Sequence, residues 1–148
     1  MGLEVKLLPT DDPMLHKPAR PCPKSMVNRV SNKLFTIYYT PPWGVCAGMA
    51  APQIGYPYRM FVAKGMLFVN PKAFTLMGQT YETTEGCFSI PGKVHRVKRY
   101  EKVQIDIDSQ LVNFSGYMAQ VIQHEYDHIM GVLISDREKE LEIHTKDI

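Results

Sequence analysis

The sequence predicts an α+β fold, in which antiparallel β-strands pack around a central helix near the C-terminus and a second helix lies near the N-terminus. Residues 116–130 have helical periodicity, with Ser115 as a possible N-cap and Gly131 as the C-cap. Residues 103–108 alternate between apolar and polar side chains, which is typical of a half-buried antiparallel strand. A chain of 148 residues with 45% hydrophobic residues can bury one core, so we expect one domain spanning residues 1–148.

The N-terminal half of the chain predicts one helix and two short strands. Residues 3–23 are proline-rich and irregular, with a turn at Asp-Asp-Pro. Residues 25–39 place apolar side chains on one helical face, with Ser25 as the N-cap. Residues 43–55 have neither helical nor strand periodicity, which predicts a loop. Residues 59–62 and 66–69 are expected to form two strands joined by a turn.

The C-terminal half predicts longer strands before the helix. Residues 72–82 resemble a strand broken at Gly78, and residues 94–108 a second strand. Residues 108–113 are expected to form a turn and the approach to the helix. Residues 137–146 form a charged tail, which we expect to be solvated and too close to the preceding helix to fold back as another one.

Composition limits the classes of function. A net charge of +2 produces no strong field, so neither DNA nor another nucleic acid is expected as the main ligand. Cys22, Cys46 and Cys87 are an odd and sparse set, which argues against a disulfide framework and for a reducing compartment. No segment has the length and apolarity of a signal peptide or a membrane span. We therefore expect a soluble cytoplasmic monomer, with organellar or virus-encoded versions left open.

The predicted C-terminal helix carries His124, Glu125 and His128, an H-E-x-x-H pattern. Residues four apart lie on one helical face, so the two imidazoles can bind one metal ion while Glu125 reaches its open side. Catalytic metal sites of this kind normally have three protein ligands, so a third must come from elsewhere in the chain.

The third ligand has several candidates. A metzincin would have histidine where this chain has Ile134, which excludes that class. A glutamate of the charged tail, Glu138, Glu140 or Glu142, is one alternative. Cys87 is the better candidate, because a thiolate binds zinc or ferrous iron strongly and the neighbouring Gly86 lets the backbone approach closely.

Three segments together resemble the peptide deformylase family. Residues 48–53 are Gly-Met-Ala-Ala-Pro-Gln, residues 85–89 are Glu-Gly-Cys-Phe-Ser, and residues 123–131 are Gln-His-Glu-Tyr-Asp-His-Ile-Met-Gly. The resemblance extends from about Pro9 to Arg137. It implies a metal-dependent hydrolase that removes the N-formyl group from the N-terminal methionine of nascent polypeptides and releases formate. It also implies one divalent ion per chain, Fe²⁺ in the cell and Zn²⁺, Ni²⁺ or Co²⁺ in purified protein.

The resemblance assigns roles to individual residues. Cys87, His124 and His128 would bind the metal, and Glu125 would transfer protons. The side-chain amide of Gln53 and the backbone N–H of Phe88 would stabilise the oxyanion. Residues expected to contact the substrate are Ala47, Gly48, Glu85, Gly86, Tyr117, Gln120 and Val121. Glu85 and Asp127 are also expected to support the ligands from behind, with Arg99 as a possible partner.

The sequence departs from the family pattern at three positions. Cys46 replaces the first glycine of a Gly-x-Gly segment, which suggests that a second thiol near Cys87 promotes oxidative inactivation. Phe88 stands where leucine is usual. Gln120 is polar where an aliphatic residue is expected, which suggests a relaxed preference for methionine.

Other functions remain open on the sequence alone. One is a related metal-dependent amidase or peptidase with altered selectivity for the N-terminal residue. Another is a structural metal module in which Cys22 provides a fourth ligand. The basic residues between 93 and 102 are compatible with a solvated strand face or with transient contact with the ribosome.

Overall fold

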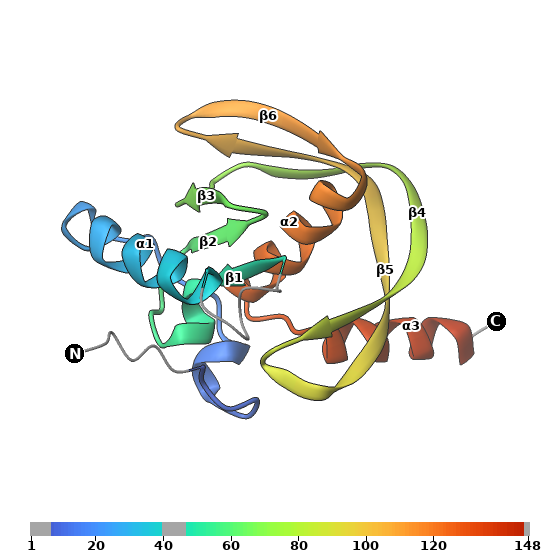
Figure 1. The fold of residues 1–148 in the computed structure, drawn as a ribbon. Coiled ribbons are helices and arrows are strands. Elements are labelled where there is room, and N and C mark those ends of the chain that lie inside the picture. The colour runs from blue at the N-terminus through green and yellow to red at the C-terminus, as the bar shows by residue number, and fades with distance from the viewer. Residues whose placement is uncertain (1–6, 40–46, 147–148) are drawn as a thin grey trace.

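The computed structural model describes residues 7–39 and 47–146, with side chains as far as residue 142. Helix α2 (Gly116–Ile129) passes through the middle of the molecule, between two three-stranded antiparallel sheets (Figure 1). Helix α1 (Lys24–Tyr38) packs on the first sheet, and helix α3 (Ile134–Lys146) packs on the second. The predicted α+β fold is therefore confirmed.

The first sheet consists of β1 (Gly48–Ala50), β2 (Met60–Ala63) and β3 (Met66–Val69), in that order. Lys64 and Gly65 have positive φ angles, 47° and 82°, and connect β2 to β3 as a two-residue hairpin. Both α1 and α2 contact β2, so all four of its residues are buried. The two strands predicted here are confirmed.

The second sheet is a long curved hairpin with a third strand at its edge. It contains β4 (Phe74–Cys87), β5 (Ile90–Ile107) and β6 (Gln110–Ser115). The register shifts between Met77 and Thr80, so the predicted break at Gly78 is a bulge inside one continuous strand. The prediction that residues 108–113 approach the helix is wrong. Only Asp108 and Ser109 form a turn, and β6 then pairs with β5.

The main hydrophobic core holds α2 between the two sheets. Its buried members come from both sheets and from α2, and include Phe61, Phe68, Val103, Ile105, Ala119, Ile122 and Ile129. The Phe61 and Phe68 rings stack with their centroids 4.7 Å apart. Because this core determines which side of α2 faces inward, it also determines the direction in which the two histidines of the motif point.

The charged tail forms a helix, so the prediction that it cannot fold back is wrong. Gly131 has a φ of 78°, which reverses the chain directly after α2. Leu133 and Ile134 then enter an apolar cluster with Leu15 and Val97. This anchorage places α3 on β5 without a long connection.

The prediction of a loop at residues 43–55 is wrong for the residues that the structure describes there, because Gly48–Ala50 form β1 and Ala51–Ile54 form a 3-10 turn. Cys46 lies outside the described residues, and so does the hypothesis that its thiol lies near Cys87. Among the described helices, none is both long and apolar enough to cross a membrane.

The N-terminal segment, residues 8–19, binds to all three motif segments. It does so through three hydrogen bonds: Leu8 N to Gln53 O (2.9 Å), Thr10 Oγ1 to Ser89 O (2.5 Å) and Ala19 N to Ile129 O (2.7 Å). It also crosses Gly131 so closely that a Cβ there would lie 2.6 Å from the carbonyl carbon of Lys17. The glycine after α2 is therefore required by this crossing as well as by its φ angle.

Candidate metal centre

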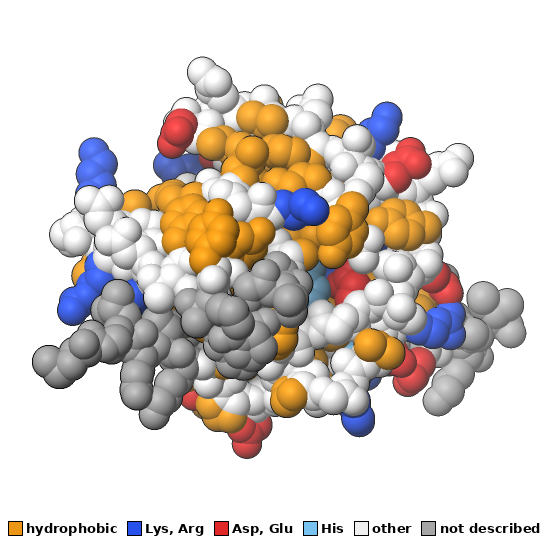
Figure 2. All heavy atoms as spheres, viewed as in Figure 1, with side chains coloured by type: hydrophobic (Ala, Val, Ile, Leu, Met, Phe, Trp, Pro, Cys, Tyr) orange, Lys and Arg blue, Asp and Glu red, His pale blue; other side chains and the backbone are white. Residues whose placement is uncertain are grey.

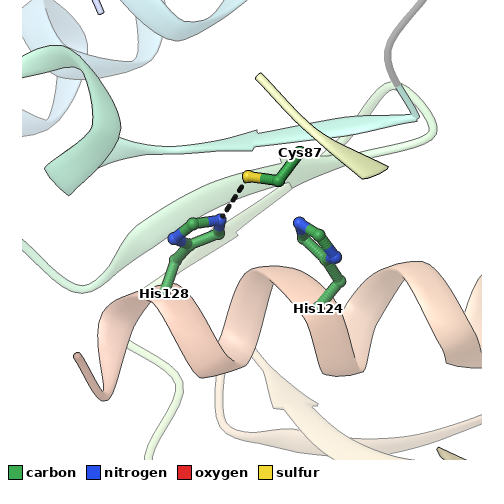
Figure 3. A group of neighbouring side chains, drawn as sticks. All are labelled: Cys87, His124 and His128. Carbon is green, nitrogen blue, oxygen red and sulfur yellow. Dashed lines mark hydrogen bonds between the residues drawn. The ribbon is translucent and has the colours of Figure 1, made fainter. Parts of the chain in front are cut away.

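The structure brings together the three residues predicted to bind a metal. Cys87, at the end of β4, points toward His124 and His128 on α2, and the candidate ligand atoms all lie within 4.8 Å of one another (Figure 3). The distance between Cys87 Sγ and His128 Nε2 is 3.4 Å. Tetrahedral coordination with Zn–S and Zn–N bonds of about 2.3 and 2.1 Å separates S from N by about 3.6 Å. The residues therefore fit one divalent ion.

His124 is oriented by a carboxylate. Its Nδ1 lies 2.8 Å from Glu85 Oε1, so Nε2 is directed toward the thiol of Cys87. Metal-binding histidines are commonly held in this way, because the second hydrogen bond fixes both the ring orientation and the tautomer. Glu85 was predicted as a substrate contact; it lines the pocket, but its carboxylate is bound to other protein groups.

Three side chains bind the Glu85 carboxylate through four hydrogen bonds. Arg99 donates from Nε (2.9 Å) and Nη2 (2.7 Å), and Gln120 donates from Nε2 (3.0 Å), while His124 takes the fourth position. Burial raises the pKa of Glu85, but the hydrogen bonds from Arg99 and His124 outweigh it and bring the pKa to about 2. Glu85 is therefore ionised at neutral pH.

Arg99 is buried beneath the site rather than solvated on the strand face. It is 2% exposed, and its Nη1 donates to Asp127 Oδ2 at 2.7 Å. Arg137 of α3 binds the same carboxylate through Nε (3.1 Å to Oδ2) and Nη2 (2.7 Å to Oδ1). The arrangement of Arg99 with Glu85 and Asp127 agrees with the predicted support behind the ligands. The sequence did not predict Arg137, because its position follows from α3.

The thiol of Cys87 is prepared for metal binding. Burial raises its pKa, but the charge of His128 and hydrogen bonds with both imidazoles lower the pKa to about 4. For His124, burial lowers the pKa, but hydrogen bonds with Cys87 and Glu85 raise it well above its usual value. The thiolate is therefore available, and metal binding must displace the proton that His124 holds.

Glu125 lies directly over β1. It is 3% exposed, and burial raises the pKa of Glu125 to about 7. A Cβ on Gly48 would be 2.7 Å from Glu125 Oε2 and 2.6 Å from the carbonyl oxygen of Val62. Glycine is therefore needed at position 48 to leave room for this carboxylate.

Gln53 is held in one orientation by two neighbours. Its Oε1 accepts from Ala50 N at 2.9 Å, and its Nε2 donates to Ser89 Oγ at 2.9 Å. The same Nε2 lies 3.7 Å from Cys87 Sγ, so the amide is at the edge of the metal cluster. The role of Ser89 was not predicted from the sequence. Its place two residues after Cys87, together with the need to orient a buried amide, was the signal that could have found it.

A cavity of about 580 Å³ opens beside the cluster. Histidine and acidic side chains are visible in a hollow on this face, with hydrophobic side chains nearby (Figure 2). Every residue predicted to act on the substrate lines this cavity: Ala47, Gly48, Gln53, Glu85, Gly86, Phe88, Tyr117, Gln120, Val121 and Glu125. The tip of the β4–β5 hairpin, residues 90–93, adds a wall that the sequence did not predict.

The alternative ligands lie elsewhere. Glu138 pairs with His95, and Glu140 pairs with Arg137. Cys22 is buried in a different apolar cluster, with α1 and β2. Among the described residues, the group of candidate metal ligands contains neither a glutamate of the tail nor Cys22. Neither alternative ligand is therefore supported.

A helix that presents His-Glu-x-x-His to a single thiolate, at the side of an open cavity, defines a metal-dependent hydrolase. Residues 5–144 match the family Polypeptide deformylase. The chain belongs to this family, as the three sequence segments predicted.

Known proteins agree with this assignment. Peptide deformylase 1 of Clostridium perfringens is 38% identical over 102 residues, which are 62% of this chain and 69% of that protein. The crystal structure of peptide deformylase from Thermotoga maritima superposes with a TM-score of 0.77 at 30% identity, covering 90% of this chain and 96% of that one. A Plasmodium falciparum peptide deformylase in complex with an inhibitor gives a TM-score of 0.82 at 26% identity, covering 96% and 94%. The protein is accordingly an enzyme that removes the N-formyl group from nascent polypeptides, and its family is metal-dependent.

Proposed function

We propose that Cys87, His124 and His128 bind the single divalent ion of this deformylase and that Glu125 is its general base and acid. The observation that carries the proposal is the convergence of one sulfur and two imidazoles within 4.8 Å of one another, at the wall of the cavity that Glu125 also lines. When bound, the ion supplies Lewis acidity, which lowers the pKa of a water molecule and polarises the formyl carbonyl.

Glu125 transfers the protons of the reaction. Burial raises the pKa of the Glu125 carboxyl, and a carboxylate with a raised pKa can both accept a proton from the attacking water and return it to the leaving amine. Its burial keeps bulk water away from this exchange. The products are formate and a free N-terminal amine.

Gln53 and Phe88 support the developing oxyanion. The amide Nε2 of Gln53 lies beside the sulfur and is held by Ser89, so it is already oriented before the reaction begins. The backbone N–H of Phe88 comes from the residue after the thiolate ligand, and Phe88 lines the same cavity.

The cavity walls bind the peptide. Ala47, Gly48 and Gly86 leave main chain accessible at the cavity, which suits an extended substrate. Tyr117, Gln120 and Val121 come from α2 and line the part that receives the first side chain. Glu85 acts through His124 more than through the substrate, because four donors already bind its carboxylate.

Several finer points are part of the proposal. One thiolate and two imidazoles suit Fe²⁺ in the cell and Zn²⁺, Ni²⁺ or Co²⁺ after purification. The free thiols of Cys22 and Cys87 suit a reducing compartment such as the cytoplasm.

The site is built within one chain, which supports a single catalytic domain over residues 1–148 that works as a monomer. Exposed Lys93, Arg96 and Lys98 on β5 are available for transient contact with the ribosome.

A related amidase or peptidase with altered selectivity is the second candidate. It is favoured by Gln120, whose amide lies in the pocket wall where it bonds Glu85 and the Tyr81 hydroxyl. A polar wall changes which first residue is preferred, while the chemistry at the ion stays the same.

The deciding experiment is release of formate from formyl-Met-Ala-Ser under anaerobic conditions with defined metals. We expect turnover by the wild type, and loss of turnover with retained metal in Glu125→Ala. Acetyl-Met-Ala-Ser serves as the control substrate, and its equal hydrolysis would favour the second candidate. A Glu125→Ala variant with unchanged turnover would refute the proposed role of the carboxylate.

A further inference from the structure

We infer that α3 helps to position the metal ligand His124 through a continuous series of charged hydrogen bonds that begins at Arg137. The inference rests on the proposed function, because it takes His124 as a ligand. The role of Arg137 is that of a positioning residue.

 What the structure shows is that Arg137 is not among the residues that line the cavity, so it acts only through its neighbours.

The series has four links, and each is a charged hydrogen bond. The donors and acceptors are Arg137 Nη2 to Asp127 Oδ1 (2.7 Å), Arg99 Nη1 to Asp127 Oδ2 (2.7 Å), Arg99 Nη2 to Glu85 Oε1 (2.7 Å) and His124 Nδ1 to Glu85 Oε1 (2.8 Å). Charge-assisted hydrogen bonds of this length are strong and directional. A change in one member therefore alters the preferred position of the next.

Burial makes the series rigid. Arg99 is 2% exposed, and Glu85 and Asp127 are each 8% exposed, so water cannot easily replace a lost partner. The guanidinium of Arg99 is planar and binds Glu85 and Asp127 on different edges, so the position of Asp127 determines the plane in which Glu85 is held.

Arg137 fixes Asp127 at the outer end. Its Nε and Nη2 bind the two carboxylate oxygens of Asp127 as a fork. The Arg137 side chain is 34% exposed, so it can be replaced without opening a cavity in the core. Replacement would leave Asp127 with Arg99 as its remaining charged partner in the series, and the carboxylate would be free to rotate.

The same helix provides a matched control. Glu138, the next residue of α3, binds His95 Nδ1 of β5 at 2.5 Å. This pair also joins α3 to β5, but among the described residues neither of its side chains has a hydrogen bond to a metal ligand or to a member of the series. Loss of Glu138 should therefore weaken the attachment of α3 without disturbing His124.

The experiment compares Arg137→Gln with Glu138→Gln in the Co²⁺-loaded enzyme. The readouts are the rate of Co²⁺ loss to a chelator and the absorption bands of Co²⁺, including thiolate charge transfer in the near ultraviolet. Loss of a partner behind a metal ligand commonly weakens metal binding 10- to 100-fold. Because Arg137 is further from the ion, we expect release about 10-fold faster in Arg137→Gln, with shifted visible bands, and a change below about 2-fold in Glu138→Gln.

Thermal unfolding of both variants separates positioning from stability. Equal acceleration of Co²⁺ release in the two variants, or unchanged bands in Arg137→Gln, would overturn the inference. If Arg137→Gln does not fold, Arg137→Lys carries the same comparison, since it keeps the charge but not the fork. A wild type that shows no thiolate-to-Co²⁺ band would instead refute the proposed ligand set, so the two failures are distinguishable.

Discussion

The two histidines of α2 have the same place in the motif but different surroundings. His124 Nδ1 is bound to the Glu85 carboxylate at 2.8 Å, and that carboxylate belongs to a buried network of charges. His128 is 2% exposed, and its Nδ1 has no hydrogen-bond partner among the described residues. The imidazole of His124 is therefore oriented from behind by a carboxylate, whereas His128 has only its contact with Cys87, at 3.4 Å from Nε2, on the cavity side.

This difference shows that a short motif determines which side chains meet but not how firmly each is held. Helical spacing places both rings on one face of α2. The partner that distinguishes them comes from β4, which is remote in sequence. We expect mutations to separate the shared role of the two rings from their different support.

The largest effect is expected from removing either ring. His124→Ala and His128→Ala should both lose the ion and with it at least about 100-fold of the activity, because two protein ligands hold such an ion poorly. Metal content after gel filtration and formate release measure the effect. Cys22→Ala, which removes a thiol from another apolar cluster, is the control. An ion retained at full occupancy in either histidine variant would remove that ring from the ligand set.

Glu85→Gln should affect His124 selectively. The variant keeps the shape of the side chain but loses the charge that orients the imidazole, so we expect metal affinity to fall about 10- to 100-fold. Chelator competition measures the affinity. The control is Glu82→Gln on the same strand, where the glutamate pairs with Arg96 on the exposed face. Similar affinities for the two variants would contradict a special role for Glu85.

The pH dependence of stability should sharpen the same contrast. The pKa of Glu85 is lowered from 4.5 to about 2 in the folded protein, so its stabilisation is present above about pH 4.5 and is lost as the pH falls toward 2. The lowering corresponds to about 3 kcal/mol. The unfolding temperature of the metal-free protein should therefore fall more steeply below pH 4.5 in the wild type than in Glu85→Gln. If the unfolding temperatures of the two proteins change in parallel with pH, the ionised Glu85 does not contribute this stabilisation.

The smallest effect is expected from Gln120→Ile. The substitution removes one hydrogen bond to Glu85 and makes the pocket wall apolar. We expect selectivity for formyl-Met over formyl-Gln peptides to rise up to about 10-fold, as measured by kcat/KM. Gln104→Ile, the same substitution on β5 outside the cavity lining, is the control. Equal selectivity in the wild type and Gln120→Ile would reject a relaxed preference for methionine.

The sequence predicted those parts of the molecule that depend on local spacing or on the three motif segments. The α2 helix and its two histidines follow from periodicity, and Cys87 follows from ligand chemistry and its glycine neighbour. The sequence could not show α3, because its anchorage depends on Leu133 and Ile134 meeting Leu15 and Val97 in three dimensions. The links from Arg137 to His124 remained hidden for the same reason.

The sequence also did not predict strand β6 or the hydrogen bonds that orient Gln53. Residues 110–115 alternate too briefly to be distinguished from a turn, and their strand state depends on pairing with β5. The orientation of Gln53 depends on Ser89, which is distant in sequence and close only after the second sheet has formed. Both features depend on tertiary contacts, which periodicity does not report.

The hydrogen bonds of residues 8–19 have a consequence for folding during synthesis. This segment leaves the ribosome before Gln53, Ser89 and Ile129, the residues whose carbonyl groups it binds. Its hydrogen bond to Ile129 therefore cannot form until α2 has been translated, and only then can the segment hold all three partners at once. The contacts of this early stretch are thus completed late in synthesis, so the fold is not completed simply in the order of the sequence.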